Sequence, residues 1–212
     1  PEHYVDAWLA SRSLYHLDQH LASHSDQPFL MFSSFPKPHS AFDPPRPFDA
    51  YYDPRQMLDP VGSAELLAER GLSALASRPA EYEWDRLSPE ASRTIKAFYY
   101  GLVTFQDQQV GRIVDFLEQR GLRQNTIVVY CADHGEMLGE HGEPAHSYFI
   151  YQGVVRVPLI FRLPGGGPAR TVDGVAGIVD IVPTVCGLMG IETPPDVAGV
   201  DLSAVLRVAA TP

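Results

Sequence analysis

The sequence is poor in cysteine and in basic residues, and it has no long apolar run. Its two cysteines, Cys131 and Cys186, each lie in an apolar stretch, which favours buried thiols over a disulfide. The 16 Lys and Arg against 26 Asp and Glu give a net charge of −10, which argues against nucleic acid as a partner. No stretch approaches the roughly 20 apolar residues that a membrane span needs. A secreted, periplasmic or cytoplasmic location is compatible with these features.

The spacing of apolar residues predicts alternating helices and strands in one domain. The predicted helices cover residues 4–23, 61–76, 88–120 and 178–189. The predicted strands cover residues 28–34, 126–131 and 155–162, and the run 126–131 is typical of a buried parallel strand. In the long helix, Ser88 and Pro89 supply the start and Gly121 the end. This order indicates an α/β sheet with helices on its faces.

Asp133 and His134 directly follow the predicted strand 126–131, and Gly135 after them allows the backbone to turn sharply. Ligands of open α/β sheets bind outside the carboxyl ends of the strands. A carboxylate oxygen and an imidazole nitrogen together suit a divalent cation. The pattern therefore predicts a metal site here. The alternative is a turn in which Asp133 caps the backbone and His134 packs.

Two further histidines lie in loops. The loop at about residues 35–60 is long for a simple connection, and such loops are often functional. Its segment Lys37-Pro38-His39 places a histidine just after a predicted strand, where it can hydrogen-bond or protonate an anionic oxygen. His146 lies in a loop that returns toward the strand 155–162, so we expect it to face Asp133 across a site. A solvated surface position is the alternative for both histidines.

Five segments resemble the C-terminal part of the catalytic domain of the sulfatases, in the alkaline phosphatase superfamily. They occur in the family's order and span roughly residues 5–205: 28–34 followed by 37–45, 99–103 with 107–112, 125–142, 155–160 and 179–185. The resemblance implies an α/β fold, a three-layer sandwich with a mostly parallel central sheet, incomplete at its N-terminus. It implies that residues 1–212 are the C-terminal portion of such a domain, with the loop 35–60 at the active site.

The resemblance also implies roles for individual residues. Asp133 and His134 match ligands of the divalent metal, for which Ca²⁺ is expected first and Mn²⁺ second. His39 matches the histidine that contacts the transferred sulfuryl group, and His146 matches a lysine or histidine that contacts this group or the leaving oxygen. Both are therefore expected to be catalytic and substrate-binding, and Lys37 is expected beside them as a substrate contact. The implied activity is metal-dependent hydrolysis of small-molecule or saccharide sulfate esters.

The sequence departs from the family at the nucleophile. The family's formylglycine is made from the Cys or Ser of a Cys/Ser-x-Pro-x-Arg motif, and neither cysteine lies in one. We therefore expect the formylglycine and further metal carboxylates upstream of these residues, and the isolated chain to be an inactive, poorly stable fragment of a longer enzyme. The alternatives are a phosphonate monoester or phosphodiester hydrolase of the same superfamily and a catalytically inactive relative.

Overall fold

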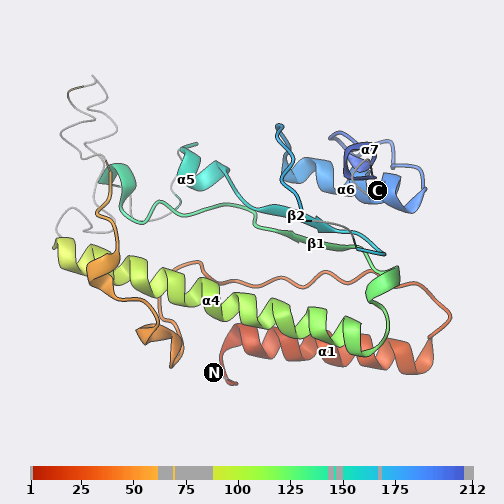
Figure 1. The fold of residues 1–212 in the computed structure, drawn as a ribbon, viewed down its shortest axis with the longest axis horizontal. Helices are drawn as coiled ribbons and strands as arrows, with labels where there is room; N and C mark the ends of the chain where they lie inside the picture. Colours follow the sequence, from red (N-terminus) through yellow and green to blue (C-terminus); the bar gives the residue numbers. More distant parts are fainter. Residues whose placement is uncertain are drawn as a thin grey trace. The chain divides into compact units, whose positions relative to one another are not determined.

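The computed structural model describes residues 2–61, 69, 88–142, 146, 150–166 and 169–207, and the chain divides into two compact units (Figure 1). Unit 1 comprises Pro1–Leu117 and Glu136–Val154, and unit 2 comprises Glu118–Gly135 and Val155–Pro212. Most of the predicted helix 61–76 lies outside the described residues. No helix among the described residues is long and apolar enough to cross a membrane.

Two long helices, α1 (Val5–Ser23) and α4 (Pro89–Gln119), confirm the helices predicted from the apolar periodicity. Helix α4 begins where the sequence predicts, because Ser88 Oγ accepts the backbone N–H of Ala91 at 3.2 Å. It ends shortly before Gly121, whose φ of 68° is a conformation that residues with a Cβ rarely adopt. Local signals therefore set both ends of this helix.

An aromatic cluster joins α1, α4 and the 3₁₀ turn η1 (Phe48–Ala50) in unit 1. Phe105 of α4 is fully buried, and its ring packs edge-on against Tyr4 and Phe48 at centroid distances of 5.2 and 5.1 Å. Ala7 of α1 completes the cluster. This packing holds α1 beside α4 (Figure 1) and fixes the start of α1 against the long loop.

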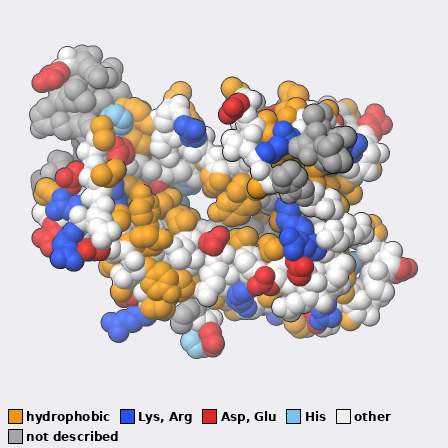
Figure 2. All heavy atoms as spheres, viewed as in Figure 1, with side chains coloured by type: hydrophobic (Ala, Val, Ile, Leu, Met, Phe, Trp, Pro, Cys, Tyr) orange, Lys and Arg blue, Asp and Glu red, His pale blue; other side chains and the backbone are white. Residues whose placement is uncertain are grey.

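The segment 28–34 is extended, but it pairs with no other strand among the described residues, so the strand predicted there is wrong for this part of the chain. Leu30 and Phe32 are 94% and 88% exposed. Figure 2 shows hydrophobic side chains, in orange, at several places on the face in view. A strand needs a neighbour for its N–H and C=O groups, which the apolar pattern of one segment does not provide. The loop predicted at 35–60 contains η1 and a second 3₁₀ turn, η2 (Pro54–Gln56).

The sheet described in unit 2 has two strands, β1 (Val128–Cys131) and β2 (Leu159–Arg162), which pair antiparallel. Both lie within predicted strands, but the expectation of a buried parallel strand at 126–131 is wrong. Strand β1 is half-buried and pairs antiparallel, because a short apolar run fits either direction and the neighbour decides. Both cysteines are free as predicted, and Cys186 is buried, but Cys131 at the end of β1 is exposed.

The other regular elements described in unit 2 are helical. They are η4 (Arg123–Asn125), η6 (Ile178–Asp180), α6 (Ile181–Met189) and α7 (Ser203–Arg207). Elements η6 and α6 together confirm the helix predicted at 178–189. The described residues thus combine helices with a two-stranded antiparallel sheet, and the predicted three-layer sandwich with a mostly parallel sheet is not seen among them.

Candidate active site

Asp133 and His134 lie in unit 2, just beyond the end of β1. Asp133 is exposed, and its Oδ1 accepts the backbone N–H of His134 at 3.0 Å. The ring Nδ1 of His134 lies 2.9 Å from the carbonyl oxygen of Gly135. A carbonyl oxygen only accepts hydrogen bonds, so this contact requires the proton on Nδ1. In the neutral ring, the lone pair is therefore on Nε2.

This geometry fits a divalent cation. A metal-binding histidine commonly donates its other ring N–H to a carbonyl, which fixes the ring and presents the lone pair to the metal. Asp133 adds a carboxylate oxygen from the same turn, which hard cations prefer. The pair supplies two ligands, whereas Ca²⁺ takes roughly six to eight. Metal binding by Asp133 and His134 stays a prediction.

His39 lies in unit 1, in the loop that follows the extended segment. Its side chain is exposed, and its backbone N–H donates to the carbonyl oxygen of Pro36 at 3.2 Å. The ring Nδ1 lies 2.8 Å from the carbonyl oxygen of Ser40. As in His134, this contact requires the proton on Nδ1 and places the lone pair of the neutral ring on Nε2. The loop therefore fixes which ring nitrogen can act on another group.

His146 lies between η5 (Glu140–Gly142) and α5 (Gln152–Val155) and is half-buried. Its ring contacts that of His39, with the centroids 5.0 Å apart and the planes tilted by 51°. On its other side, Nδ1 lies 3.5 Å from a carboxylate oxygen of Glu136, whose side chain is 3% exposed. The two histidines, which were expected to approach one site from separate loops, are in contact within unit 1.

The sequence did not point to Glu136, although it follows Asp133 by three residues in the same segment. No periodicity marks a carboxylate that becomes buried beside a histidine, so only the fold reveals the contact. Asp133 and His134 belong to unit 2, while His39 and His146 belong to unit 1. The shared cavity predicted for all four residues therefore stays a prediction.

Lys37, predicted as a substrate contact, is largely buried in the His39 loop. Its ammonium donates to the Asp43 carboxylate at 2.5 Å and to the carbonyl oxygen of Ala41, and its side chain is 12% exposed. A contact between Lys37 and substrate stays a prediction. The partners seen in the structure are acceptors of its own loop.

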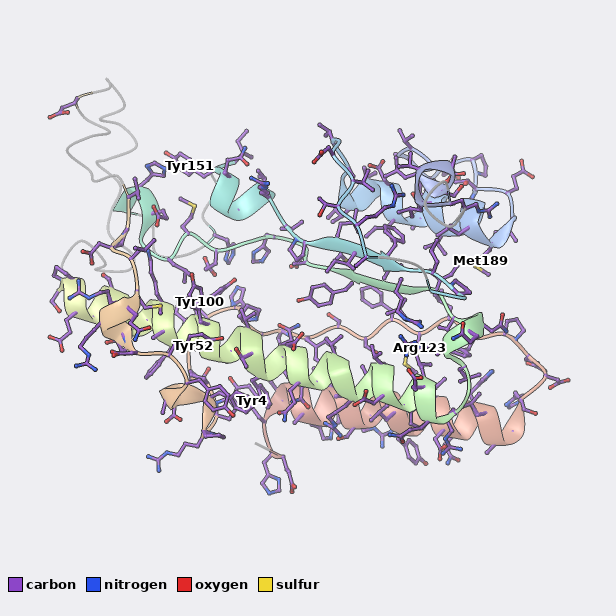
Figure 3. All side chains as sticks on the ribbon, viewed as in Figure 1. Tyr4, Tyr52, Tyr100, Arg123, Tyr151 and Met189 are labelled. Atoms are coloured by element: carbon purple, nitrogen blue, oxygen red, sulfur yellow. The ribbon has the colours of Figure 1, made fainter. Side chains whose placement is uncertain are left out.

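The segment that carries His146 also lines a cavity of about 330 Å³ within unit 1. Its lining residues are Val61, Met137, Glu140, His141, Tyr151, Gln152 and Gly153. The rings of His141 and Tyr151 stack with centroids 4.5 Å apart, and Figure 3 labels Tyr151 just before α5. Glu140 forms an ion pair of 3.2 Å with Lys96 of α4. This ion pair ties the cavity wall to the helical frame of unit 1.

Known proteins resemble the chain over most of its length. The sulfatase family profile matches residues 6–191. The chain is 30% identical to a choline-sulfatase of Rhizobium meliloti, over 92% of this chain and 39% of that protein. It is 31% identical to an arylsulfatase of Clostridium perfringens, over 94% of this chain and 41% of that protein. It is 37% identical to an N-acetylglucosamine-6-O-sulfatase of Bacteroides thetaiotaomicron, over 64% and 25%.

Solved structures with the same fold include two phosphonate monoester hydrolases. The enzyme from Silicibacter pomeroyi superposes with a TM-score of 0.78 at 30% identity, over 98% of this chain and 42% of that one. The enzyme from Agrobacterium radiobacter gives a TM-score of 0.80 at 26% identity, over 98% and 43%. The chain spans about two-fifths of the length of the curated choline-sulfatase and arylsulfatase it matches.

Proposed function

The chain belongs to the sulfatase family, and we propose that it supplies part of the active site of a metal-dependent hydrolase of sulfate esters. The observation that carries this proposal is the contact between His39 and His146, with ring centroids 5.0 Å apart. Two segments far apart in the sequence bring these imidazoles together in a chain of this family. Hydrolysis of an anionic ester would use both imidazoles as hydrogen-bond donors.

Cleavage of a sulfate ester places negative charge on the oxygen of the leaving alcohol and on the sulfuryl oxygens. In the proposed site, His39 presents Nε2 to a sulfuryl oxygen, because its Nδ1 is held by the carbonyl of Ser40, and it donates from Nε2 when both ring nitrogens carry a proton. His146 donates to the sulfuryl group or to the leaving oxygen. The buried Glu136 carboxylate lies 3.5 Å from Nδ1 of His146, on the side of the ring away from His39.

Asp133 and His134 would hold one divalent cation, for which Ca²⁺ is the first candidate and Mn²⁺ the second. When bound, such an ion supplies positive charge that stabilises the anionic groups of the reaction. The nucleophile in this proposal is a formylglycine from outside these 212 residues. The alcohol half of the substrate includes saccharides, a proposal supported by the relative named as an N-acetylglucosamine-6-O-sulfatase.

A second candidate is hydrolysis of phosphonate monoesters or phosphodiesters. The likeness to the two phosphonate monoester hydrolases favours it, with TM-scores of 0.78 and 0.80. The same histidine pair would then contact phosphoryl oxygens. The described residues fit both anions, so the choice between them needs substrates of both kinds.

The test uses the full-length protein with added divalent metal, assayed on an aryl sulfate, a sulfated aminosugar and an aryl phosphonate monoester. We expect the aryl sulfate or the sulfated sugar to be preferred. His39→Asn and His146→Asn should each lower kcat by about 100-fold or more, and Asp133→Asn should weaken metal binding measured by calorimetry. The control His24→Asn alters an exposed histidine of α1's C-terminal end and should leave kcat unchanged. A preference for the phosphonate ester would favour the second candidate, and full activity of both site variants would refute the histidine roles.

A further inference from the structure

Four residues at the start of α1 and in the His39 loop form one polar cluster, which we call the Lys37 cluster: Tyr4, Asp6, Lys37 and Asp43. The Lys37 ammonium donates to Asp43 Oδ1 at 2.5 Å, and the Tyr4 hydroxyl lies 3.1 Å from the same oxygen and 3.1 Å from the Asp43 carbonyl oxygen. The backbone N–H of Lys37 donates to Asp6 Oδ1 at 3.3 Å. Figure 3 labels Tyr4 at the N-terminal end of α1.

The cationic side chain of the cluster, Lys37, is shielded from water. The side chain of Lys37 is 12% exposed and Asp6 is fully buried, while the carboxylate side chain of Asp43 is 63% exposed. A buried ammonium is costly unless acceptors satisfy it, and here Asp43 and the carbonyl of Ala41 do so. These two acceptors therefore stabilise the Lys37 ammonium in its buried position.

The protonation of the cluster supports the same geometry. Burial, and then the Asp43 carboxylate, raise the pKa of Tyr4, so its hydroxyl keeps the proton that it donates. Burial raises the pKa of Asp43, but the hydrogen bond and charge of Lys37 outweigh it and hold this pKa below its ordinary value. Asp43 is therefore a carboxylate at neutral pH, as an ion pair with Lys37 requires.

The contacts of Lys37 close residues 37–43 into a compact loop that contains His39. Lys37 lies two residues before His39, and its ammonium reaches Ala41 and Asp43 on the other side of that histidine. Within residues 37–43, the contact of His39 Nδ1 with the carbonyl of Ser40 fixes which nitrogen of the imidazole can act on another group. Tyr4 and Asp6 connect this loop to the start of α1.

We propose that Lys37 and Asp43 are positioning residues for His39, fastened to α1 by Tyr4 and Asp6. The inference rests on the proposed function only in its assumption that His39 contacts the ester. Lys37 then acts on the reaction through the loop and not by touching the substrate. The competing role, a direct contact between Lys37 and the sulfuryl group, makes different predictions.

The kinetic test uses Lys37→Met, Asp43→Asn and the double variant in the full-length protein. Misplacement of His39 should lower kcat by roughly 10-fold or more in each single variant and leave KM within about twofold. The double variant should be no worse than the worse single variant, because both substitutions break one ion pair. If Lys37→Met raises KM while Asp43→Asn has no effect, Lys37 binds the substrate directly and the proposal is overturned.

The same loop offers a matched control, the ion pair between Arg46 and Asp49. It is 3.7 Å long, and the side chain of Arg46 is 93% exposed, so Arg46→Met removes a surface ion pair of little energetic value. Its kcat should equal that of the wild type. Asp43→Asn guards against loss of the fold, because it keeps the shape and an acceptor oxygen for Lys37 and removes only the charge.

A spectroscopic measurement separates this proposal from the proposed function. Nuclear magnetic resonance of isotope-labelled histidine rings, with His39 identified by its loss in His39→Asn, reports the proton on Nδ1. Lys37→Met and Asp43→Asn should both shift the His39 ring signals, and Arg46→Met should not. If the wild type hydrolyses none of the esters, the proposed function fails while these signals still decide the positioning. Unchanged His39 signals in both cluster variants would overturn the proposal.

Discussion

Two glycines of α4 differ in what surrounds them, although both lie inside the same helix. A Cβ added at Gly101 would lie 2.4 Å from the carbonyl oxygen of Phe48 and 3.2 Å from its carbonyl carbon. A Cβ added at Gly111 would meet nothing within 4 Å. Alanine at the two positions therefore makes a matched pair, in which the change in helix propensity is the same and the steric result differs.

The two substitutions are expected to change the free energy of unfolding by different amounts. Alanine in a helix interior is favoured over glycine by about 1 kcal/mol, so Gly111→Ala should stabilise the protein by roughly that amount. At Gly101 the added methyl group meets backbone atoms, which cannot rotate away, so α4 and η1 must separate. Forcing extra volume into a packed site costs about 1 to 3 kcal/mol. Gly101→Ala should therefore be less stable than Gly111→Ala by about 1 to 3 kcal/mol.

Thermal unfolding followed by circular dichroism measures the difference. For a chain of this size, 1 kcal/mol shifts Tm by about 2 to 4 °C. Gly111→Ala should raise Tm, and Gly101→Ala should lie several degrees below it. Equal gains in Tm for the two variants would refute the close approach of α4 to the backbone of Phe48.

Two further substitutions test the core of unit 1 and the α6 region of unit 2. Phe105→Ala removes a fully buried ring and should lower the free energy of unfolding by about 3 to 5 kcal/mol in urea titrations. The control Phe32→Ala, at a residue 88% exposed, should change this free energy by less than about 0.5 kcal/mol. Similar losses in the two variants would contradict the assigned core. The N–H groups of Gly177 and Val200 each donate to Asp180 at 2.8 Å and lower its pKa, so its stabilising effect is present above the unfolded pKa of about 3.9 and is lost as the pH falls through the folded pKa. Asp180→Asn should therefore destabilise the protein at neutral pH more than at acidic pH in thermal unfolding, with Asp173→Asn, at an exposed aspartate, as the control.

The helices were predictable from the sequence because their signals are local. The start of α4 depends on Ser88 and its end on Gly121, and each acts within a few residues of its own position. The apolar spacing of α1 and α6 likewise identified the helices without reference to the rest of the chain. The turn after β1 with Asp133 was also predictable, because a glycine follows a short apolar run.

Strand pairing was not predictable in the same way. The segments 28–34 and 126–131 both have strand-like composition, but the first pairs with no described strand and the second pairs antiparallel. In the site, the histidines were identified by their place after predicted strands. Asp43 and Glu136 were missed, because a carboxylate becomes important there only through a partner that the fold brings to it.

Two ion pairs fasten the segments that carry His39 and His146 to the helices of unit 1. On the His39 side, Lys37 and Asp43 connect the loop to the first turn of α1 through the Lys37 cluster. On the His146 side, Lys96 of α4, itself 8% exposed, holds Glu140 at 3.2 Å. The two helices are joined in turn by the packing of Phe105 against Tyr4. Both ion pairs are largely buried on the lysine side, so loss of either acceptor would leave an ammonium without its charge partner. The position of each imidazole is therefore tied to helix packing some distance away, and changes in unit 1 that never touch a substrate should still be felt at the histidine pair.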